Sequence, residues 1–345
     1  RSRGLGDVYK RQITGGTGFI GTHLASLLHE VHPETRIYNL DIVEPGTPLP
    51  TVKNYKPALG NGEEHAATFI YCDVRQPIEL EKVNITPDDV IFNFAAVHRT
   101  PGHPDPAYFE TNIRGAENVC AFAERHGIRK IVFTSSIAPY GAAEELKEET
   151  TLPMPNTPYG ISKLVAEKIH QTWQAGGEGR QLTIVRPGVV FGRGENGNFT
   201  RLYWGIRGHK FMYPGRKDTI KACIYVKELV RFMLYRLEHH DSGVELYNCC
   251  YEPAYTIEHI VESMKRVTNM KVKVPFMPGW LIMTAAGIAG ALGSPMGICP
   301  ARVRKLQIST NICGKKLSAS GYRFRYTFEE ALADWYKDNG NLYLQ

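Results

Sequence analysis

The sequence lacks an uninterrupted apolar run long enough to cross a membrane. One uncharged stretch, Met277 to Ile298, is broken by glycine and proline, and its helix-like part is Trp280 to Leu292. That part is shorter than the roughly 20 residues of a membrane span. We therefore expect a buried helix of a substrate-binding lobe rather than membrane contact. The polar N-terminus has no apolar core of a signal peptide, so a cytoplasmic location is expected.

Cysteine and net charge are also scarce. The seven cysteines form no Cys-x-x-Cys pair, and no Cys/His cluster has the spacing of metal ligands. We expect free thiols in a reducing compartment and no metal site. The net charge of +6 comes from 41 basic and 35 acidic residues, and the basic ones are scattered rather than striped. This charge does not support nucleic-acid binding.

The first 12 residues do not fit the glycine-rich motif that comes after them. A turn of this kind at Thr14–Gly21 should be preceded by a short, buried, apolar strand, yet Lys10, Arg11 and Gln12 occupy those positions. Residues 1–12 resemble a translated adapter fused to a truncated reading frame. We take them as a non-native leader that replaces the natural first strand.

The pattern of strands and helices predicts an α/β fold, a doubly wound parallel sheet of Rossmann type with a smaller C-terminal substrate-binding lobe. We assign residues 13–186 to the sheet domain. Residues 187–345 are assigned mainly to the lobe, with some segments returning to the sheet domain. The buried strands are expected at five apolar runs: Ile37–Leu40, Phe69–Cys72, Val90–Phe94, Ile131–Thr134 and Leu182–Val185.

A dinucleotide site is indicated by three glycines, Gly15, Gly18 and Gly21, spaced Gly-x-x-Gly-x-x-Gly. Glycine there lets the turn tighten and lets a helix N-terminus approach the pyrophosphate. A plain tight turn is the alternative. Asp41 ends the next strand, where an acid binds the adenosine ribose and repels a 2′-phosphate, so NAD is favoured over NADP. Asp73-Val74 follows the third strand and either meets the adenine or lies in an exposed loop.

An acid/base pair is indicated by Tyr159 and Lys163, which share one face if the segment is helical. A nearby ammonium and the positive nicotinamide favour the phenolate, which brings the tyrosine toward a useful general base. Ser136, at the end of a strand, can hydrogen-bond both the substrate oxygen and the phenol. A simple surface pair on a helix is the alternative.

Together these motifs resemble the extended short-chain dehydrogenase/reductases, and within them the NAD-dependent epimerase/dehydratase family, over residues 13–340. The matching stretches are Thr14–Gly21, Asp41, Asp73-Val74, Asn93–Ala96, Asn112, Thr134–Ser136, Tyr140-Gly141, Tyr159-x-x-x-Lys163 and Arg186-Pro187. The resemblance implies a catalytic set of Ser136, Tyr159 and Lys163, with Asn112 supporting a water linked to Lys163. It implies further NAD contacts from Phe19, Ile20, Ala95, Ala96 and Pro187.

Several positions depart from the nucleotide-sugar members of this family. Val189 stands where an asparagine usually anchors the diphosphate, and Lys221 replaces an arginine, losing its bidentate fork. Asn198 and Arg201 are candidates to compensate, or they are surface residues. Ile137-Ala138 replaces the acid pair of the 4,6-dehydratases, which disfavours dehydration. His98-Arg99 either touches the substrate or caps a loop.

The sequence therefore predicts an NAD-dependent epimerase of a nucleotide-diphosphate sugar, acting through a transient keto intermediate. Two other functions stay open. Val189 and the apolar stretch favour a net dehydrogenase or reductase of a less polar alcohol, resembling 3β-hydroxysteroid dehydrogenase or dihydroflavonol reductase. A non-catalytic NAD-sensing regulator is the third, although such proteins commonly lose the Tyr or Lys that this chain keeps. By analogy we expect a homodimer through helices near Ala107–His126 and Tyr159–Gln174.

Overall fold

A seven-stranded sheet is the centre of the first of two compact units. The computed structural model describes residues 10–45, 67–98, 102–141, 143–241, 243–281, 284 and 307–345. The first unit comprises residues 1–141, 149–187 and 226–248, and the second comprises residues 142–148, 188–225 and 249–345. Stretches that are distant in the sequence thus fold together in each unit.

The sheet of the first unit has the strand order β12-β7-β5-β4-β1-β2-β3, and the pairings from β3 through to β7 are parallel. This is the predicted Rossmann-like fold, which is therefore confirmed. All five apolar runs match strands whose ends lie within two residues of theirs. The strands are β1 Lys10–Thr14, β2 Arg36–Asp41, β3 Thr68–Tyr71, β4 Val90–Asn93, β5 Lys130–Thr134, β7 Gln181–Pro187 and β12 Val244–Cys249.

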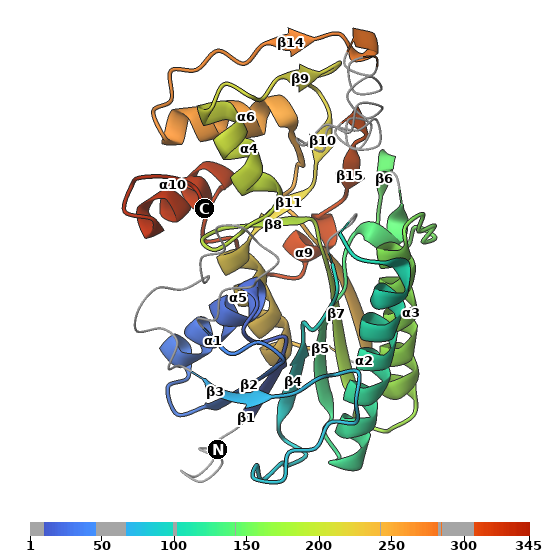
Figure 1. Cartoon of the computed structure of the whole chain (residues 1–345). Coiled ribbons are helices and arrows are strands. Elements are labelled where there is room, and N and C mark those ends of the chain that lie inside the picture. The colour runs from blue at the N-terminus through green and yellow to red at the C-terminus, as the bar shows by residue number, and fades with distance from the viewer. Residues whose placement is uncertain are drawn as a thin grey trace. The chain divides into compact units, whose positions relative to one another are not determined.

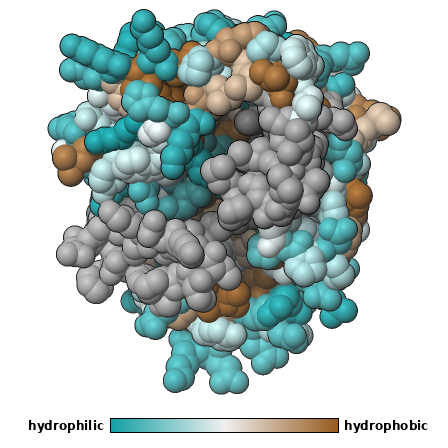
Figure 2. All heavy atoms as spheres, turned by 45° about the horizontal axis from the view of Figure 1, so that its top comes forward, coloured by the Kyte–Doolittle hydropathy of each residue, from teal (hydrophilic) through white to brown (hydrophobic). Residues whose placement is uncertain are grey.

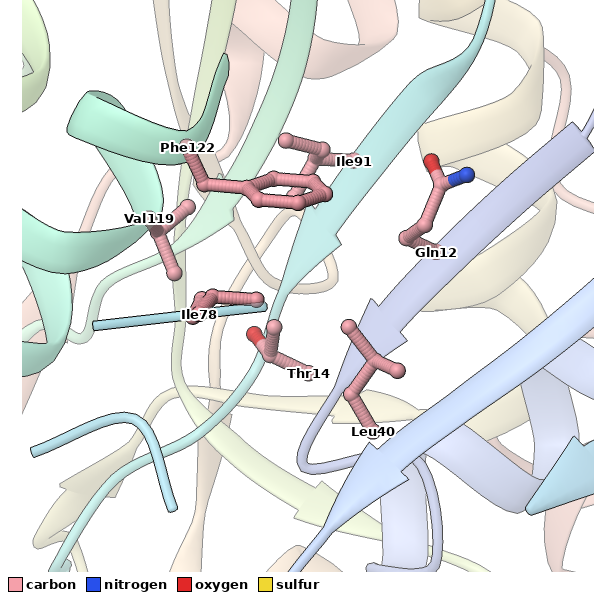
Figure 3. Close-up of a pocket in the computed structure, with 7 residues that line it drawn as sticks. All are labelled: Gln12, Thr14, Leu40, Ile78, Ile91, Val119 and Phe122. Atoms are coloured by element: carbon pink, nitrogen blue, oxygen red, sulfur yellow. The ribbon is translucent and has the colours of Figure 1, made fainter. Parts of the chain in front are cut away.

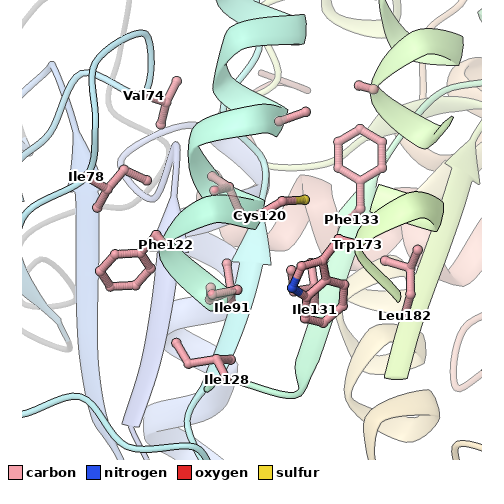
Figure 4. Packing of buried hydrophobic residues seen from close by; sticks show 14 of the residues in the cluster. Val74, Ile78, Ile91, Cys120, Phe122, Ile128, Ile131, Phe133, Trp173 and Leu182 are labelled. Carbon is pink, nitrogen blue, oxygen red and sulfur yellow. The ribbon is translucent and has the colours of Figure 1, made fainter. Parts of the chain in front are cut away.

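Helices cover both faces of this sheet (Figure 1). On one face α2 Asp105–Arg125 packs along α3 Pro158–Ala175, and on the other α1 Phe19–Val31 packs on α5 Val226–Glu238. The main apolar core lies between the sheet and the α2/α3 pair (Figure 4). Because both faces are covered, the central strands are apolar throughout rather than alternating.

Strand β1 forms in spite of its polar residues, because it pairs with β2 on one side and β4 on the other. Gln12 is fully buried there. Its Nε2 donates to Oδ2 of Asp89 at 3.2 Å, while its Oε1 has no hydrogen-bond partner among the described residues. The surroundings are mostly apolar and leave no space for a water molecule. Figure 3 draws the lining residues Gln12, Thr14, Leu40, Ile78, Ile91, Val119 and Phe122. This pocket is a packing defect of the core. It is not a ligand site.

The second unit is built from short strands and helices around an aromatic core. Phe191 stacks on Phe199 and Tyr225, with ring centroids 4.7 and 5.4 Å apart, and meets Phe328 edge to face. The strands are β6 Ala143–Lys147, β8 Val189–Phe191, β9 Tyr213–Pro214, β10 Ile220–Lys221, β11 Cys223–Tyr225, β13 Tyr255–Thr256, β14 Phe276–Met277 and β15 Thr310–Ile312. The helices are α4 Asn198–Arg207, α6 Ile257–Val267, α9 Lys315–Ala319 and α10 Phe328–Asp338.

The expected buried helix between Met277 and Ile298 lies mostly outside the described residues, which include only positions 277–281 and 284 of it. Within the part of the chain that the structure describes, no helix has the length and apolar character needed to cross a membrane.

Candidate active site

The glycine-rich turn lies between β1 and α1 in the first unit, and two of its glycines are required by close backbone contacts. Gly15 has a φ of +71°, and a Cβ there would lie 2.7 Å from the Ala95 backbone nitrogen, at the end of β4. A Cβ at Gly21 would lie 2.6 Å from the Gly16 carbonyl oxygen. Helix α1 therefore starts directly against the carboxyl ends of the strands.

The first turn of α1 is open to an anion. Gly18 is its N-cap, no side chain caps it, and the first turn carries no acidic residue. Unsatisfied backbone N–H groups and the positive end of the helix dipole favour a phosphate at such a terminus. Phe19, Ile20 and Gly21 supply these first N–H groups, as the sequence predicts for a pyrophosphate site.

Asp41 lies at the end of β2, directly beside the glycine turn. Its Oδ2 accepts from the Thr17 backbone N–H at 3.2 Å, and its Oδ1 accepts from those of Ile42 at 2.8 Å and Val43 at 3.2 Å. These bonds fix the carboxylate at the place where a ribose diol would meet it. The glycine cradle, the uncapped helix and this acid together fit a bound NAD.

Asp73 and Val74 follow β3 in different environments. Asp73 is held by a bidentate fork from Arg75, with Nε–Oδ1 and Nη2–Oδ2 distances of 2.9 and 2.6 Å, and this hydrogen bonding lowers the pKa of the carboxyl. Val74 is buried, and a Cβ added at Gly115 on α2 would lie 3.0 Å from its side chain. Ala95 and Ala96 follow β4 and are partly buried, and Pro187 ends β7.

The predicted catalytic residues come together at the start of α3. Thr157 caps this helix by accepting from the Gly160 N–H at 3.0 Å, and Pro158 occupies its first turn, where a missing N–H costs nothing. Ser136, just after β5, accepts from the Ala138 N–H at 3.1 Å and hydrogen-bonds Tyr159. Burial raises the pKa of Tyr159, and the bond from Ser136 partly offsets this.

Lys163 lies one turn beyond Tyr159 and is almost completely buried, at 2% exposure. Its Nζ lies 4.2 Å from the centre of the Phe133 ring, a cation–π contact. Burial lowers the pKa of Lys163 to about 7, while the negative charge of Glu167 raises it. The ammonium therefore titrates near neutral pH before any ligand binds, and its protonation depends on its neighbours.

Sequence reasoning missed the ion pair that supplies this neighbouring charge. Glu167 on α3 accepts from Nε of Arg186 at 2.8 Å and from its Nη2 at 2.6 Å, and both side chains are buried. Ser135 donates to the same carboxylate at 2.5 Å. Glu167 is four residues after Lys163, so the spacing that marks Tyr159 and Lys163 as one helix face extends to it.

A second buried chain of hydrogen bonds, also missed, ties α3 to the strands. Thr14 donates to Asn93 Oδ1 at 2.8 Å, and Asn93 Nδ2 lies 3.2 Å from His170 Nε2. His170 Nδ1 lies 2.7 Å from the Ala166 carbonyl, so it carries the proton. Burial lowers the pKa of His170 to about 4. The His170 ring stacks on the ring of Phe133, which also contacts Lys163. This histidine is a neutral part of the core.

Asn112 on α2 connects the loop after β4 to α3. Its Oδ1 accepts from the Val97 N–H at 2.9 Å, and its Nδ2 donates to the Val97 carbonyl at 3.1 Å and to Ser162 Oγ at 2.8 Å. Both amide hydrogens are thus used, and one lone pair of Oδ1 is left to accept from a water. Ser162 in turn donates to the Tyr159 carbonyl at 2.9 Å.

The predicted substrate residues are spread over both units. His98 is exposed after β4 in the first unit, and Arg99 lies outside the described residues. In the second unit Asn198 and Arg201 are exposed on α4 and bond to each other at 3.0 Å. Lys221 donates to the Ile308 carbonyl at 2.7 Å, and Val189 pairs with Cys223 in the β8–β11 ladder.

Metal and disulfide chemistry are not indicated. Among the described residues no cluster of three or more His, Cys, Asp or Glu could hold a metal ion. The six cysteines in the described ranges are all free thiols, and five of them are buried.

The comparisons with known proteins agree with this geometry. The model of the NAD dependent epimerase/dehydratase family matches residues 12–250. The chain is 30% identical over 326 residues to N-acetyl-alpha-D-glucosaminyl-diphospho-ditrans,octacis-undecaprenol 4-epimerase of Escherichia coli O157:H7, covering 93% of this chain and 92% of that protein. It is 26% identical to UDP-glucose 4-epimerase 3 of Oryza sativa subsp. japonica, over 77% of this chain and 78% of that one.

Among solved structures, the fold is similar to that of UDP-N-acetylglucosamine 4-epimerase from Methanobrevibacter ruminantium M1 in complex with UDP-N-acetylmuramic acid. The TM-score is 0.73 at 20% sequence identity, covering 96% of this chain and 98% of that one.

Proposed function

We propose that the chain, which belongs to the NAD-dependent epimerase/dehydratase family, inverts the configuration at carbon 4 of a sugar joined to a diphosphate. The family recognised from the motifs, an enzyme and NAD as cofactor are confirmed. The observation that carries the reaction type is the set of Ser136, Tyr159 and Lys163, which lies in the same unit as the glycine turn. The 30% identity to a 4-epimerase over nearly the whole chain supports it.

In this proposal Tyr159 takes the proton from the sugar 4-hydroxyl, and Ser136 orients that hydroxyl by hydrogen bonding. Lys163 favours the phenolate through its charge. The glycine turn, Asp41, Asp73-Val74, Ala95-Ala96 and Pro187 would hold NAD, which would accept the hydride from the sugar carbon and give it back. The sugar passes through a transient 4-keto form, and Tyr159 returns the proton after the sugar has turned over in the site.

The carrier on the other side of the diphosphate is proposed to be a polyprenol. The relative that is 30% identical over 93% of this chain acts, by its name, on an undecaprenol-linked sugar. The nucleotide-binding positions expected in the sequence are also altered, since Val189 stands in the place of the asparagine and Lys221 bonds a backbone carbonyl. The nucleotide sugar predicted from the sequence is the second candidate, supported by the identity to a UDP-glucose 4-epimerase. In that case His98, Arg99, Asn198 and Arg201 are the residues to test for binding.

Product analysis separates these candidates. The purified chain is incubated with UDP-N-acetylglucosamine or with polyprenyl diphospho-N-acetylglucosamine, and the sugar is released by acid and separated from its 4-epimer. The account expects the 4-epimer from the polyprenyl substrate, and none from Tyr159→Phe. Tyr71→Phe, which changes an exposed tyrosine of β3, serves as the matched control and should keep full activity. Net formation of NADH with a less polar alcohol, and no epimer, would favour the dehydrogenase.

We further propose a homodimer in the cytoplasm. Ile161 and Val165 are one turn apart on α3 and are 41% and 37% exposed, which suits a helix that packs against a second copy. Light scattering should give the mass of two chains, and Ile161→Asp should give the mass of one. A single-chain mass for the unchanged protein would contradict the dimer. The free thiols suit a reducing compartment.

A further inference from the structure

Two hydrogen-bonded segments of the second unit expose large apolar side chains. β9 and β14 pair in parallel, with the Tyr213 N–H donating to the Pro275 carbonyl and the Gly215 N–H to that of Met277, both at 2.9 Å. On this ladder and just beyond it, Phe276, Trp280 and Leu281 are 51%, 72% and 42% exposed. Figure 2 brings this end of the view forward, and apolar side chains reach the surface there among polar ones. Exposed apolar side chains that are grouped mark contact surfaces, whereas those scattered singly are ordinary surface residues.

The same two segments carry positive charge and no negative charge. Residues 208–217 and 267–281 contain no Asp or Glu. Lys210, Lys271 and Lys273 are exposed, and none takes part in an ion pair among the described residues. The other lysine and arginine there, Lys217 and Arg216, are paired with Glu258, Asp218 and Glu144. Three lysines are therefore available to an external anionic partner.

Tryptophan, phenylalanine and leucine flanked by lysine form a pattern that suits the membrane interface. The aromatic rings are stable at the level of the lipid headgroups, and lysine ammonium groups are attracted to anionic lipids. The charge of the two segments that is not paired is all positive, and lysine is depleted at protein–protein interfaces, whereas it is attracted to anionic lipids. The chemistry thus favours a lipid surface.

We propose that the β9–β14 surface, made of Phe276, Trp280, Leu281, Lys210, Lys271 and Lys273, docks on a bilayer that contains anionic lipids. The proposal rests on the proposed function, because a polyprenyl diphosphate sugar has its chain in the bilayer and its sugar at the headgroups. It differs from the expectation that membrane contact is absent. That expectation considered only a span, whereas docking needs a few interfacial side chains and no transmembrane helix.

Sedimentation with vesicles tests the docking with the full chain. The protein is mixed with vesicles of phosphatidylcholine, with or without phosphatidylglycerol, and the bound fraction is measured at low and high salt. We expect binding only with phosphatidylglycerol and weaker binding at high salt. The double change Phe276→Ser and Trp280→Ser, and separately the change of the three lysines to Gln, should each lower the partition coefficient at least about tenfold, a conservative expectation for losing two interfacial aromatics or three lysines.

Trp204→Ser is the matched control, because Trp204 is a partly exposed tryptophan of α4, outside the β9–β14 surface. It should bind vesicles as the unchanged protein does. The proposal is overturned if the unchanged protein stays in the supernatant with phosphatidylglycerol, or if the Phe276/Trp280 variant binds equally well. The thermal midpoint of each variant, compared with that of the unchanged protein, shows that a loss of binding is not a loss of folding.

Activity assays separate a failure of this surface from a failure of the proposed function. With a short-chain, water-soluble prenyl diphosphate sugar, the Phe276/Trp280 variant should epimerise as fast as the unchanged protein, and with vesicle-embedded substrate it should be slower. Equal rates in vesicles would contradict the docking surface while leaving the epimerase. Phosphatidylglycerol-dependent binding with no turnover of any prenyl substrate would support the surface and remove the proposed substrate.

Discussion

At the scale of single residues, Lys163 combines two opposing demands. In the proposed mechanism it carries a charge that favours the Tyr159 phenolate, yet it is buried among α3, Phe133 of β5 and the Glu167–Arg186 pair of α3 and β7. The pKa of about 7 is the result of burial opposed by the charge of Glu167. Small changes in the surroundings of Lys163 therefore alter the fraction of protein molecules in which Lys163 is protonated.

Lys163→Met should stabilise the ligand-free protein, and the gain should depend on pH. The pKa of Lys163 is depressed in the folded state, so the unfolded chain binds the proton more tightly. Below pH 7 the buried lysine is charged in the folded protein, and its full destabilising effect is present. As the pH rises from 7 toward 10.5, the pKa of lysine in the unfolded chain, this destabilisation decreases. Urea unfolding of both proteins should show the largest difference near pH 6.5 and a smaller one at pH 9. A difference that is independent of pH would contradict this assignment.

Glu167→Gln should shift the pH profile of kcat. Without the carboxylate, the pKa of Lys163 falls further, so the loss of activity at high pH should begin at a lower pH. A shift of one unit corresponds to about 1.4 kcal/mol. Glu117→Gln, an exposed position on α2, is the control and should leave the profile unchanged.

A variant of Glu167 that leaves Arg186 alone in the core can unfold, because a buried charge without its partner is costly. The double variant Glu167→Gln and Arg186→Met removes both charges and keeps the volume. If the folded double variant and the single variant both keep the original pH profile, Glu167 has no influence on Lys163.

Gln12→Leu should stabilise the protein by about 1–2 kcal/mol, because it removes a buried acceptor without a partner and adds apolar contact in the pocket of Figure 3. Asp89 keeps its bonds from Thr86 after the change. Gln76→Leu, at an exposed position, is the control and should have little effect. An unchanged or lower urea midpoint for Gln12→Leu would show that the polar β1 is well accommodated.

The sequence predicted Tyr159, Lys163 and Ser136 as candidate catalytic residues. The spacing of Tyr159 and Lys163 and the position of Ser136 at the end of an apolar run can both be read directly from the sequence. It did not predict Arg186 as the partner of Glu167, or Asn93 as the partner of His170. These contacts join α3 to β7 and to β4, and their geometry exists only after the helix has packed on the sheet. Periodicity reports which side of a helix is buried, and it does not report which strand residue meets it.

At the scale of elements, the glycine turn links β1, α1 and the end of β4. Gly15→Ala should lower the thermal midpoint and abolish retention of NAD. The new Cβ would clash with the Ala95 backbone, and a φ of +71° is unfavourable for alanine. The left-handed conformation alone costs about 1–2 kcal/mol. Gly340→Ala is a matched control, because Gly340 has a φ of +66° with nothing within 4 Å of the added Cβ.

For Gly15→Ala, cofactor content is read from the absorbance of the supernatant after denaturation, together with the thermal midpoint. The expected order of stability is the unchanged protein, then Gly340→Ala, then Gly15→Ala. If the two variants lose the same stability and both retain NAD, the close approach of Gly15 to Ala95 has no role in the site.

The elements themselves were largely readable from the sequence. Five apolar runs predicted strands of the sheet, and each of them lies at a strand. Strand β1 was the exception. Its residues Lys10–Gln12 have no strand-like pattern, and pairing with β2 and β4 on both sides forms the strand in spite of this.

At the scale of the whole molecule, the chain crosses between the two units several times. α5 and most of β12, residues 226–248, belong to the first unit, although they follow the segment 188–225 of the second. The unit to which α5 belongs could not be read from the sequence, because an amphipathic helix has the same pattern whichever core it covers. Its place was fixed by the packing of α5 on α1.

The central claim, an epimerase that returns the hydride to the same sugar, is tested most directly with a substrate deuterated at carbon 4. The purified chain is incubated with the prenyl diphosphate sugar carrying this deuterium, and both epimers are analysed by mass spectrometry. The account predicts a mixture of the two 4-epimers, each with the deuterium retained, and no net NADH. Loss of deuterium from the product, or accumulation of a ketone together with NADH, would contradict it.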